Sequence, residues 1–198
     1  GFSIFLDKFF STGNLLTLMR SVSILGILSI AMAVVVISKG IDLSLIATLA
    51  VGTALASVMS SPDVLPSFDL PFMYAVLLGF LFTAILCAIT GILVAYWDMA
   101  SVFVTLAMAG VIYGLGRTLF IGDELNYLPE DAIWLEYLGR GQLLGVPMPI
   151  ICFLSLAFIM HLVLTKTTFG KFVYSIGDSG LAARTAGVPV RPILVIIF

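Results

Sequence analysis

The residues that usually carry catalysis or bind metals are few in this sequence and form no recognisable site. His161 is the only histidine, and the two cysteines, Cys87 and Cys152, lie in apolar runs. The sequence has no HExxH, no GxSxG and no Cys/His cluster with the spacing of metal ligands. A lone histidine is more often a satisfied polar group than a ligand, and buried cysteines behave as small hydrophobic residues. We therefore expect no catalytic residue, no metal and no cofactor, and we disfavour an intramembrane enzyme.

The sequence also lacks a phosphate-binding motif. Gly170 and Lys171 lack the glycine-rich approach and the following Ser or Thr of a phosphate-binding loop. If the protein moves a solute against its gradient with ATP, another subunit must hydrolyse that ATP. The formal net charge of -2 offers no basic surface for a nucleic acid.

Two acids near the ends of apolar runs are the remaining candidates for chemistry. Asp42 follows Lys39 by three residues, so the two side chains can pair if that turn is helical. An ionisable residue at the membrane suggests a broken-helix site beside a cavity. The alternative, an ordinary short cytoplasmic turn, fits the composition better. Asp98 lies in a short turn beside Trp97, and we expect it to be solvated.

The composition sets the fold class. Of the 198 residues, 61% are hydrophobic and 10% are charged, whereas a soluble domain has roughly 25% charged residues. This excludes an ordinary soluble enzyme and a disordered tail. In lipid every backbone N–H and C=O needs a partner within the chain, and long uncharged runs meet that need as helices. We expect an all-α fold, a polytopic helical membrane protein.

Charged residues divide the chain into runs long enough to cross a bilayer, which takes about 20 apolar residues. We expect five spans, over residues 21–38, 43–62, 70–97, 99–121 and 149–164. The apolar run from Pro192 to Phe198 is too short and is expected to begin a sixth. Because the chain starts with Gly1 and ends in this run, we expect residues 1–198 to form one transmembrane domain that is incomplete at the C-terminus and at the N-terminus.

The basic residues predict which loops face the cytoplasm. Segment 166–191 carries four basic residues against one acid, Asp178, and is expected inside. Loop 122–148 carries five acids against Arg140 and is expected outside, as is the proline-rich loop 62–71. The break at 39–42 then faces the cytoplasm.

Small residues follow one face of the second predicted span. They recur every four residues as Ser44, Thr48, Gly52, Ala56 and Ser60. Such a face lets helices approach closely in lipid, so we interpret most of it as packing, although its polar members are also candidates to line a solute path. Gly110 and Gly114 form a GxxxG pair that we interpret as packing too.

The inner loop over 166–190 has the signals of a short capped helix. Asp178 or Ser179 can begin it, residues 181–186 can fill it, and Gly187 can end it, with Pro189 preventing its return. We interpret this compact helix as a docking handle for a partner, although a mere connector is the alternative.

Four segments, taken together, resemble one family. ISKGIDLS at 37–44 resembles the GGIDLS signature of permease subunits of ABC importers for ribose, xylose and galactose. SVFVTL at 101–106 resembles the segment PxFIVTLG of that family. TFGK at 168–171 and YSIG at 174–177 resemble TxFGR…YAIGGN, and LAARTAGV at 181–188 resembles EAARLSGI, a form of the loop that docks into the ATPase. The resemblance covers roughly residues 10–198 in order. Lys39 stands where the family has glycine, and Leu181 where it has an acid.

The resemblance implies a non-catalytic permease of the bacterial inner membrane that works as a homo- or heterodimer. A periplasmic sugar-binding protein would deliver a monosaccharide, and a cytoplasmic ATP-binding subunit would dock on the loop 166–190 and drive alternating access. The residues implied in coupling to the ATPase are Gly170, Gly177, Ala182, Ala183, Arg184 and Gly187. Those implied along the translocation path are Asp42, Ser44, Phe103 and Thr105.

Two alternatives remain at this point. A permease of the same superfamily could carry another small solute, such as autoinducer-2 or a branched-chain amino acid. A stand-alone carrier driven by an ion should have carboxylates in mid-span, and neither Asp42 nor Asp98 is placed there.

Overall fold

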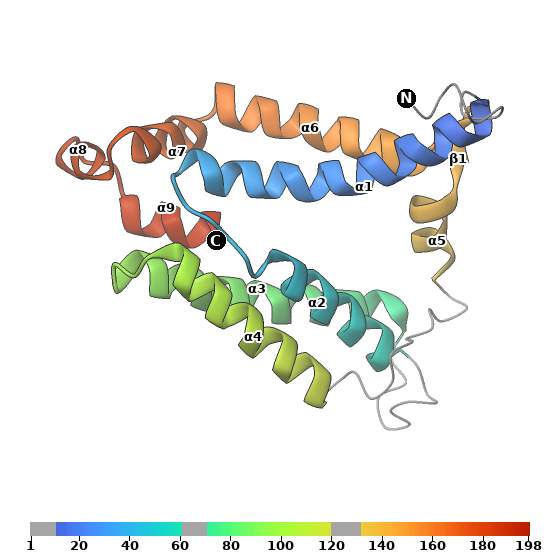
Figure 1. Ribbon diagram of the computed structural model, residues 1–198, viewed down its shortest axis with the longest axis horizontal. Helices are drawn as coiled ribbons and strands as arrows, with labels where there is room; N and C mark the ends of the chain where they lie inside the picture. The colour runs from blue at the N-terminus through green and yellow to red at the C-terminus, as the bar shows by residue number, and fades with distance from the viewer. Residues whose placement is uncertain (1–10, 61–70, 120–131) are drawn as a thin grey trace, which may run out of the picture. The chain divides into compact units, whose positions relative to one another are not determined.

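The computed structural model describes residues 11–60, 71–119 and 132–198, and almost all of the regular structure in this part of the chain is helical (Figure 1). The predicted loop 62–71 and the acidic part of the loop 122–148 fall largely outside the described residues. The elements in order are α1 (Thr12–Ile37), α2 (Leu45–Met59), α3 (Phe72–Tyr96), α4 (Ser101–Leu119), α5 (Ile133–Arg140), β1 (Gln142–Leu143), β2 (Val146–Pro147), α6 (Met148–Lys166), α7 (Thr168–Asp178), α8 (Gly180–Thr185) and α9 (Val190–Ile197).

The helical membrane fold expected from the composition is confirmed. Within the described residues, α1, α3, α4 and α6 are long and apolar enough to cross a membrane. Helix α2 has 15 residues, about 22 Å of rise, which is shorter than a hydrocarbon core of about 30 Å. The predicted span 43–62 is therefore only partly covered by this helix.

Hydroxyl side chains in these helices bond to their own backbone. Ser23 donates to the Met19 carbonyl at 2.7 Å, and Thr90 donates to the Leu86 carbonyl at 3.0 Å. This pattern satisfies a polar group inside an apolar helix without a partner from elsewhere. It explains how runs that contain Ser and Thr remain compatible with lipid.

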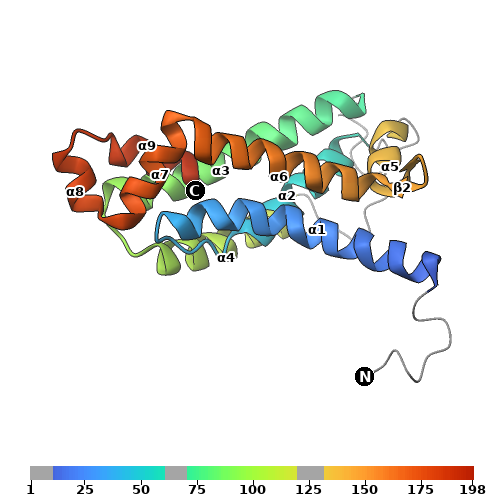
Figure 2. The same cartoon turned by 90° about the horizontal axis from the view of Figure 1, so that it is seen from above.

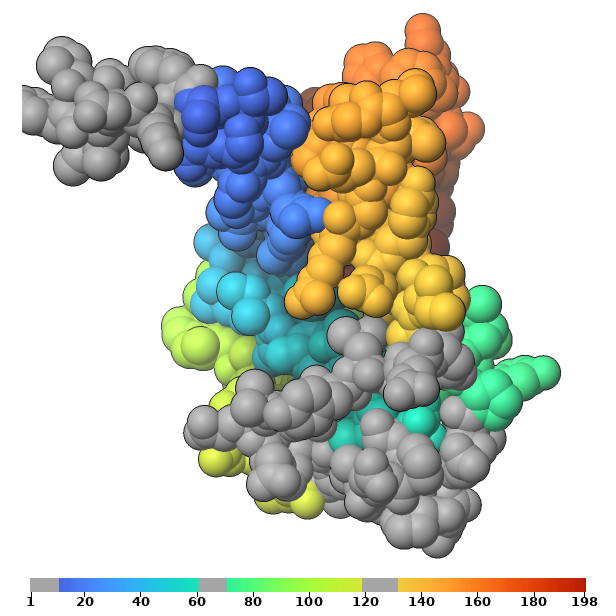
Figure 3. Space-filling model, turned by 90° about the vertical axis from the view of Figure 1, so that its right-hand side faces the viewer, coloured from blue at the N-terminus to red at the C-terminus, as the bar shows by residue number. Residues whose placement is uncertain are grey.

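The chain forms two compact units, the first made of Gly1–Ala31 and Ile133–Thr167. Arg20 of α1 donates to the Arg140 carbonyl at the end of α5, at 2.6 Å. The hairpin β1–β2 then leads into α6, and Leu144 and Gly145 at its tip both have positive φ, as a two-residue turn requires. Figures 1 and 2 show α1 beside α6, and Figure 3 shows α5 and the hairpin, yellow to orange, against the start of α6.

The second unit is made of Met32–Ala132 and Thr168–Phe198. Val51 of α2, Leu86 of α3 and Ile112 of α4 form a buried cluster. Helix α9 lies beside α3 in both ribbon views (Figures 1 and 2). A Cβ added to Gly91 of α3 would lie 2.8 Å from the Cα of Val195, so glycine permits this close approach.

The ladder of small residues on α2 packs against α3, as the packing interpretation predicted for its middle. A Cβ at Gly79 of α3 would lie 2.8 Å from the Gly52 carbonyl oxygen and 3.5 Å from the Ala56 Cβ. No described residue packs against Gly110 or Gly114, because a Cβ at either position would meet no atom within 4 Å. The interpretation of this pair as a packing motif stays a prediction.

Candidate functional site

The loop between α1 and α2 begins with a Schellman turn, which closes α1. The Gly40 amide donates to the Val35 carbonyl and the Lys39 amide to the Val36 carbonyl, both at 2.9 Å. The residue at the centre of such a turn adopts positive φ and is usually glycine. Here it is Lys39, with φ 62°. The glycine of the family signature at this position therefore has a conformational reason, and this chain departs from it at a cost in backbone energy.

Asp42 is a buried acceptor for the start of α2 and does not pair with Lys39. Its Oδ1 accepts hydrogen bonds from the Ser44 amide at 2.8 Å and from the Ser44 hydroxyl at 2.7 Å. The Lys39 ammonium instead donates to the Asp178 carbonyl at 3.1 Å, at the end of α7. The predicted pairing of Lys39 with Asp42 was wrong, since the turn is not helical and Lys39 points to another element.

The start of α4 fastens the same loop. The Ile41 amide donates to the Ser101 hydroxyl at 3.1 Å. The Thr105 hydroxyl lies 2.8 Å from the Ser101 carbonyl and 3.2 Å from the Ile41 carbonyl, and it is fully buried. Phe103 is 73% exposed, because a residue two positions from Thr105 lies on nearly the opposite side of the helix. The structure thus gathers Asp42, Ser44 and Thr105 around this loop and leaves Phe103 apart from them.

The capped helix predicted in the inner loop is α8, and it is confirmed within one residue at each end. Of the two candidate caps, Ser179 acts, because its hydroxyl accepts from the Ala182 amide at 3.3 Å. A second Schellman turn ends the helix: the Gly187 amide donates to the Arg184 carbonyl at 3.1 Å and the Val188 amide to the Ala183 carbonyl at 3.0 Å. Gly187 has φ 83°, where glycine is favoured.

The six predicted coupling residues divide between two faces of the segment 168–187. Gly170, Gly177 and Ala183 are buried, whereas Ala182, Arg184 and Gly187 are exposed. Gly177 lies against the Ile37 carbonyl at the end of α1. Leu181, beside Ala182, is 76% exposed. One face of the segment is therefore anchored to its own unit, and the other is open to a partner.

The loop after α1 and the segment 168–187, named the coupling segment below, meet at an open hollow of about 470 Å³. Its lining includes Lys39, Ser101, Leu181 and Arg184. Of the predicted site residues only Arg184 lines it, and the predicted path residues do not. Phe198, near the end of α9, lines it as well.

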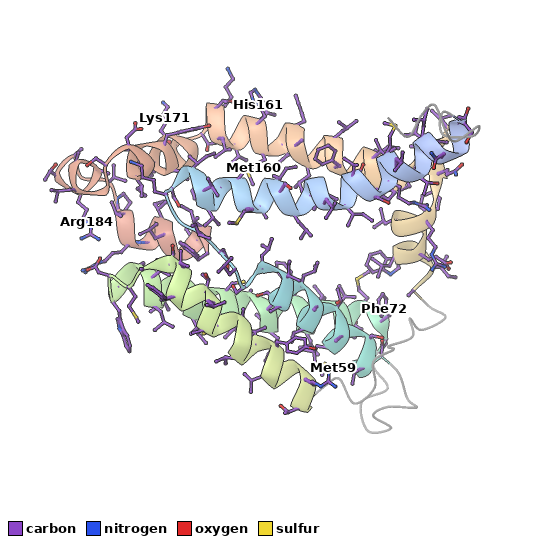
Figure 4. All side chains as sticks on the ribbon, in the orientation of Figure 1. Met59, Phe72, Met160, His161, Lys171 and Arg184 are labelled. Carbon is purple, nitrogen blue, oxygen red and sulfur yellow. The ribbon has the colours of Figure 1, made fainter. Side chains whose placement is uncertain are left out.

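Asp98 is exposed, as expected of a solvated residue, and it also forms an ion pair with Arg184 at 3.2 Å and a longer one with Arg191 at 3.9 Å. Arg191 also lies over the Tyr96 ring, 5.4 Å from its centroid. Figure 4 shows Arg184 extending from α8 toward the turn between α3 and α4. The sequence does contain a signal for this ion pair, because Asp98 is an isolated acid in a stretch with few charges.

Metal chemistry finds no support in the part of the chain that the structure describes. No three His, Cys, Asp or Glu residues come together there as ligands would. His161 projects from α6 and is exposed (Figure 4).

Comparisons with known proteins give the family. The model described as branched-chain amino acid transport system / permease component matches residues 14–198. The chain is 34% identical over 196 residues to the ribose import permease protein RbsC of Bacillus subtilis (strain 168), covering 99% of this chain and 59% of that protein. It is 30% identical over 200 residues to the L-arabinose ABC transporter permease protein AraH of Azospirillum brasilense, covering 99% and 55%. It is 29% identical over 187 residues to the galactofuranose transporter permease protein YtfT of Escherichia coli (strain K12), covering 94% and 52%.

No solved structure is significantly similar to the chain. The chain spans less than two thirds of the length of the curated relatives named above. The family match, in contrast, extends over nearly all of it, including the loop after α1, the start of α4 and the segment around α8. The chain therefore belongs to the family of permease components typified by branched-chain amino acid transport systems.

Proposed function

We propose that the chain is the membrane-spanning subunit of an ATP-driven importer of a monosaccharide in the bacterial inner membrane. A periplasmic sugar-binding protein delivers the sugar, and a cytoplasmic ATP-binding subunit supplies the energy. The named relatives support a sugar, because their names specify ribose, L-arabinose and galactofuranose. The observation that carries the proposal is α8, a capped helix with one face anchored and the other exposed.

The contacts of the coupling segment suggest how motion reaches the membrane helices. When the ATP-binding subunit moves α8, α7 moves with it, because Ser179 joins the two helices directly. Gly177 then presses on the Ile37 carbonyl, and Asp178 pulls on Lys39. Both contacts act on the loop that Ser101 and Thr105 fasten to α4.

Such a shift requires that the ATP-binding subunit bind one arrangement of α8 more tightly than the other. The chain's own residues hydrolyse nothing in this scheme. They hold the docking helix, and they pass its displacement to the helices that would flank the path.

The first experiment tests the motor. The chain is expressed with its ATP-binding subunit and binding protein, and uptake of radiolabelled ribose, L-arabinose, galactose and leucine is measured. We expect uptake of one of the sugars that requires a hydrolysis-competent ATP-binding subunit. Uptake without that subunit, abolished by a proton uncoupler, would identify an ion-driven carrier and overturn the proposal. Uptake of leucine alone would correct the substrate class.

The second experiment tests the docking face. Ala182→Glu places a charged side chain on the exposed face of α8, and we expect the ATP-binding subunit to be lost on co-purification. Gly139→Glu is the matched control, because Gly139 lies on α5 with no atom within 4 Å of an added Cβ. Equal retention of the subunit by both variants would contradict docking at α8.

The third experiment tests the side of the membrane. Thr185→Cys should react with a membrane-impermeant maleimide in inside-out vesicles and not in intact cells. The unsubstituted chain, with Cys87 and Cys152, gives the background. Labelling of Thr185→Cys in intact cells would place α8 outside, where no cytoplasmic subunit can reach it.

A further inference from the structure

Asp98 is placed by the backbone at a sharp turn between two membrane helices. Helix α3 ends at Tyr96 and α4 begins at Ser101, and Asp98 has φ 51°. Asp, Asn and Gly are the residues that adopt this left-handed conformation most readily. Glycine or asparagine would therefore serve the turn as well as aspartate, and the carboxylate adds only a negative charge.

Two guanidinium groups reach this carboxylate from opposite ends of the α8–α9 connection. Arg184, in the last turn of α8, lies 3.2 Å from Oδ1, and Arg191, in the first turn of α9, lies 3.9 Å from Oδ2. Arg191 also stacks on Tyr96, two residues before Asp98. A single acid thus connects the turn at the end of α3 to the end of α8 and to the start of α9.

These contacts are weak individually, because the paired side chains are 44%, 47% and 63% exposed and water screens them. Helix α8 has six residues and is too short to be stable alone. Its position therefore depends on the groups that hold it from outside. Weak, exposed ion pairs contribute little to folding and can break and form again without disturbing the core.

We infer that Asp98 is a positioning residue of the coupling segment: through Arg184 and Arg191 it fixes α8 relative to the turn between α3 and α4. This gives the segment a second attachment, besides the end of α1 at Ile37 and Lys39. Displacement of α8 would then act on α3 and α4 directly. The role of Asp98 in transport rests on the proposed function. The attachment of α8 through Asp98 does not.

The attachment can be tested without an ATP-binding subunit. Asp98→Asn retains the left-handed turn and the shape of the side chain and removes its charge. In nanodiscs, we expect amide hydrogen exchange to accelerate about fivefold at Ala183, Ala186 and Val188, whose amides bond within α8 and its cap. Glu136→Gln is the matched control, since it removes the carboxylate of an exposed ion pair on α5. Unchanged exchange in Asp98→Asn would overturn the attachment.

The role in transport is tested in proteoliposomes that hold the chain, the ATP-binding subunit and the sugar-binding protein. We expect Asp98→Asn to lower sugar transported per ATP hydrolysed by about fivefold, the low end of an allosteric coupling. Co-purification of the ATP-binding subunit should stay intact. Arg191→Gln removes one of the two ion pairs and should act in the same direction. The effects of the two variants should not add, because Asp98→Asn already removes that pair.

The outcomes separate the two proposals. If the unsubstituted complex shows no ATP-dependent uptake, the proposed function fails while the exchange measurement still tests the attachment. If uptake is ATP-dependent but Asp98→Asn couples normally, or if the effects of Asp98→Asn and Arg191→Gln simply add, the positioning role is wrong. Loss of the ATP-binding subunit from Asp98→Asn would also contradict it, because the residue would then form part of the docking face.

Discussion

Gly177 of α7 lies directly against the carbonyl oxygen of Ile37 at the end of α1. A Cβ at this position would overlap a backbone atom, and a backbone atom cannot turn aside as a side chain does. We therefore expect Gly177→Ala to push α7 away from α1 and to lower the free energy of unfolding by about 1–3 kcal/mol, as overpacking does. Thermal unfolding in detergent measures this, and sugar uptake should fall with it.

Gly180→Ala is the control for that change. Gly180 lies three residues further along the same segment, and an added Cβ would meet no atom within 4 Å. Its unfolding temperature should stay the same or rise slightly, because alanine favours a helix. If Gly177→Ala behaved like Gly180→Ala, the close contact with Ile37 would not limit the segment.

Lys39 has a strained backbone, and its ammonium group donates a hydrogen bond to another helix. Both Lys39→Gly and Lys39→Ala remove the hydrogen bond to the Asp178 carbonyl, but only glycine relieves the φ of 62°. We expect Lys39→Gly to be about 1 kcal/mol more stable than Lys39→Ala, the cost of a left-handed conformation for a residue with a Cβ. Chemical unfolding of the two variants in mixed micelles provides the comparison. Equal stabilities would mean that the turn relaxes when the lysine is removed.

Local sequence signals predicted α8 and both of its ends, but they did not predict the pairings between residues far apart in the chain. Ser179 and Gly187 are recognisable caps because their partners lie within five residues. The hydrogen bond between Arg184 and Asp98 joins residues 86 positions apart, and that between Lys39 and Asp178 joins residues 139 apart. A periodic pattern carries no information on such contacts, since they depend on how the helices pack.

The candidate path residues show the same limit. A motif placed Phe103 and Thr105 together, but helical geometry sends them to different sides of α4, one exposed and one buried. Gly52 and Gly110 both looked like packing positions in the sequence. Only Gly52 has a neighbouring helix against it within the described residues, because packing requires a partner as well as a small side chain.

Gly79 tests the packing of α2 against α3. Gly79→Ala should separate the two helices, because the new methyl would lie 2.8 Å from the Gly52 carbonyl oxygen. We expect a loss of about 1–3 kcal/mol in unfolding free energy. Gly114→Ala makes the same chemical change on α4 in open space and should be neutral or stabilising. A loss in Gly114→Ala that exceeds the loss in Gly79→Ala would indicate that α4 packs against another subunit.

Variants of Asp42 can distinguish a structural role of this residue from a role in the translocation path. Asp42 is 8% exposed, and its carboxylate accepts both donors of Ser44. Asp42→Ala therefore leaves a buried amide and a buried hydroxyl without this acceptor. We expect a loss of about 1–3 kcal/mol in unfolding free energy. Asp42→Asn keeps an acceptor oxygen and should lose less. If uptake falls in proportion to stability across the two variants, Asp42 supports the start of α2. If Asp42→Asn keeps full stability but loses uptake, the charge itself acts on the solute, and support of α2 is not the main function of Asp42.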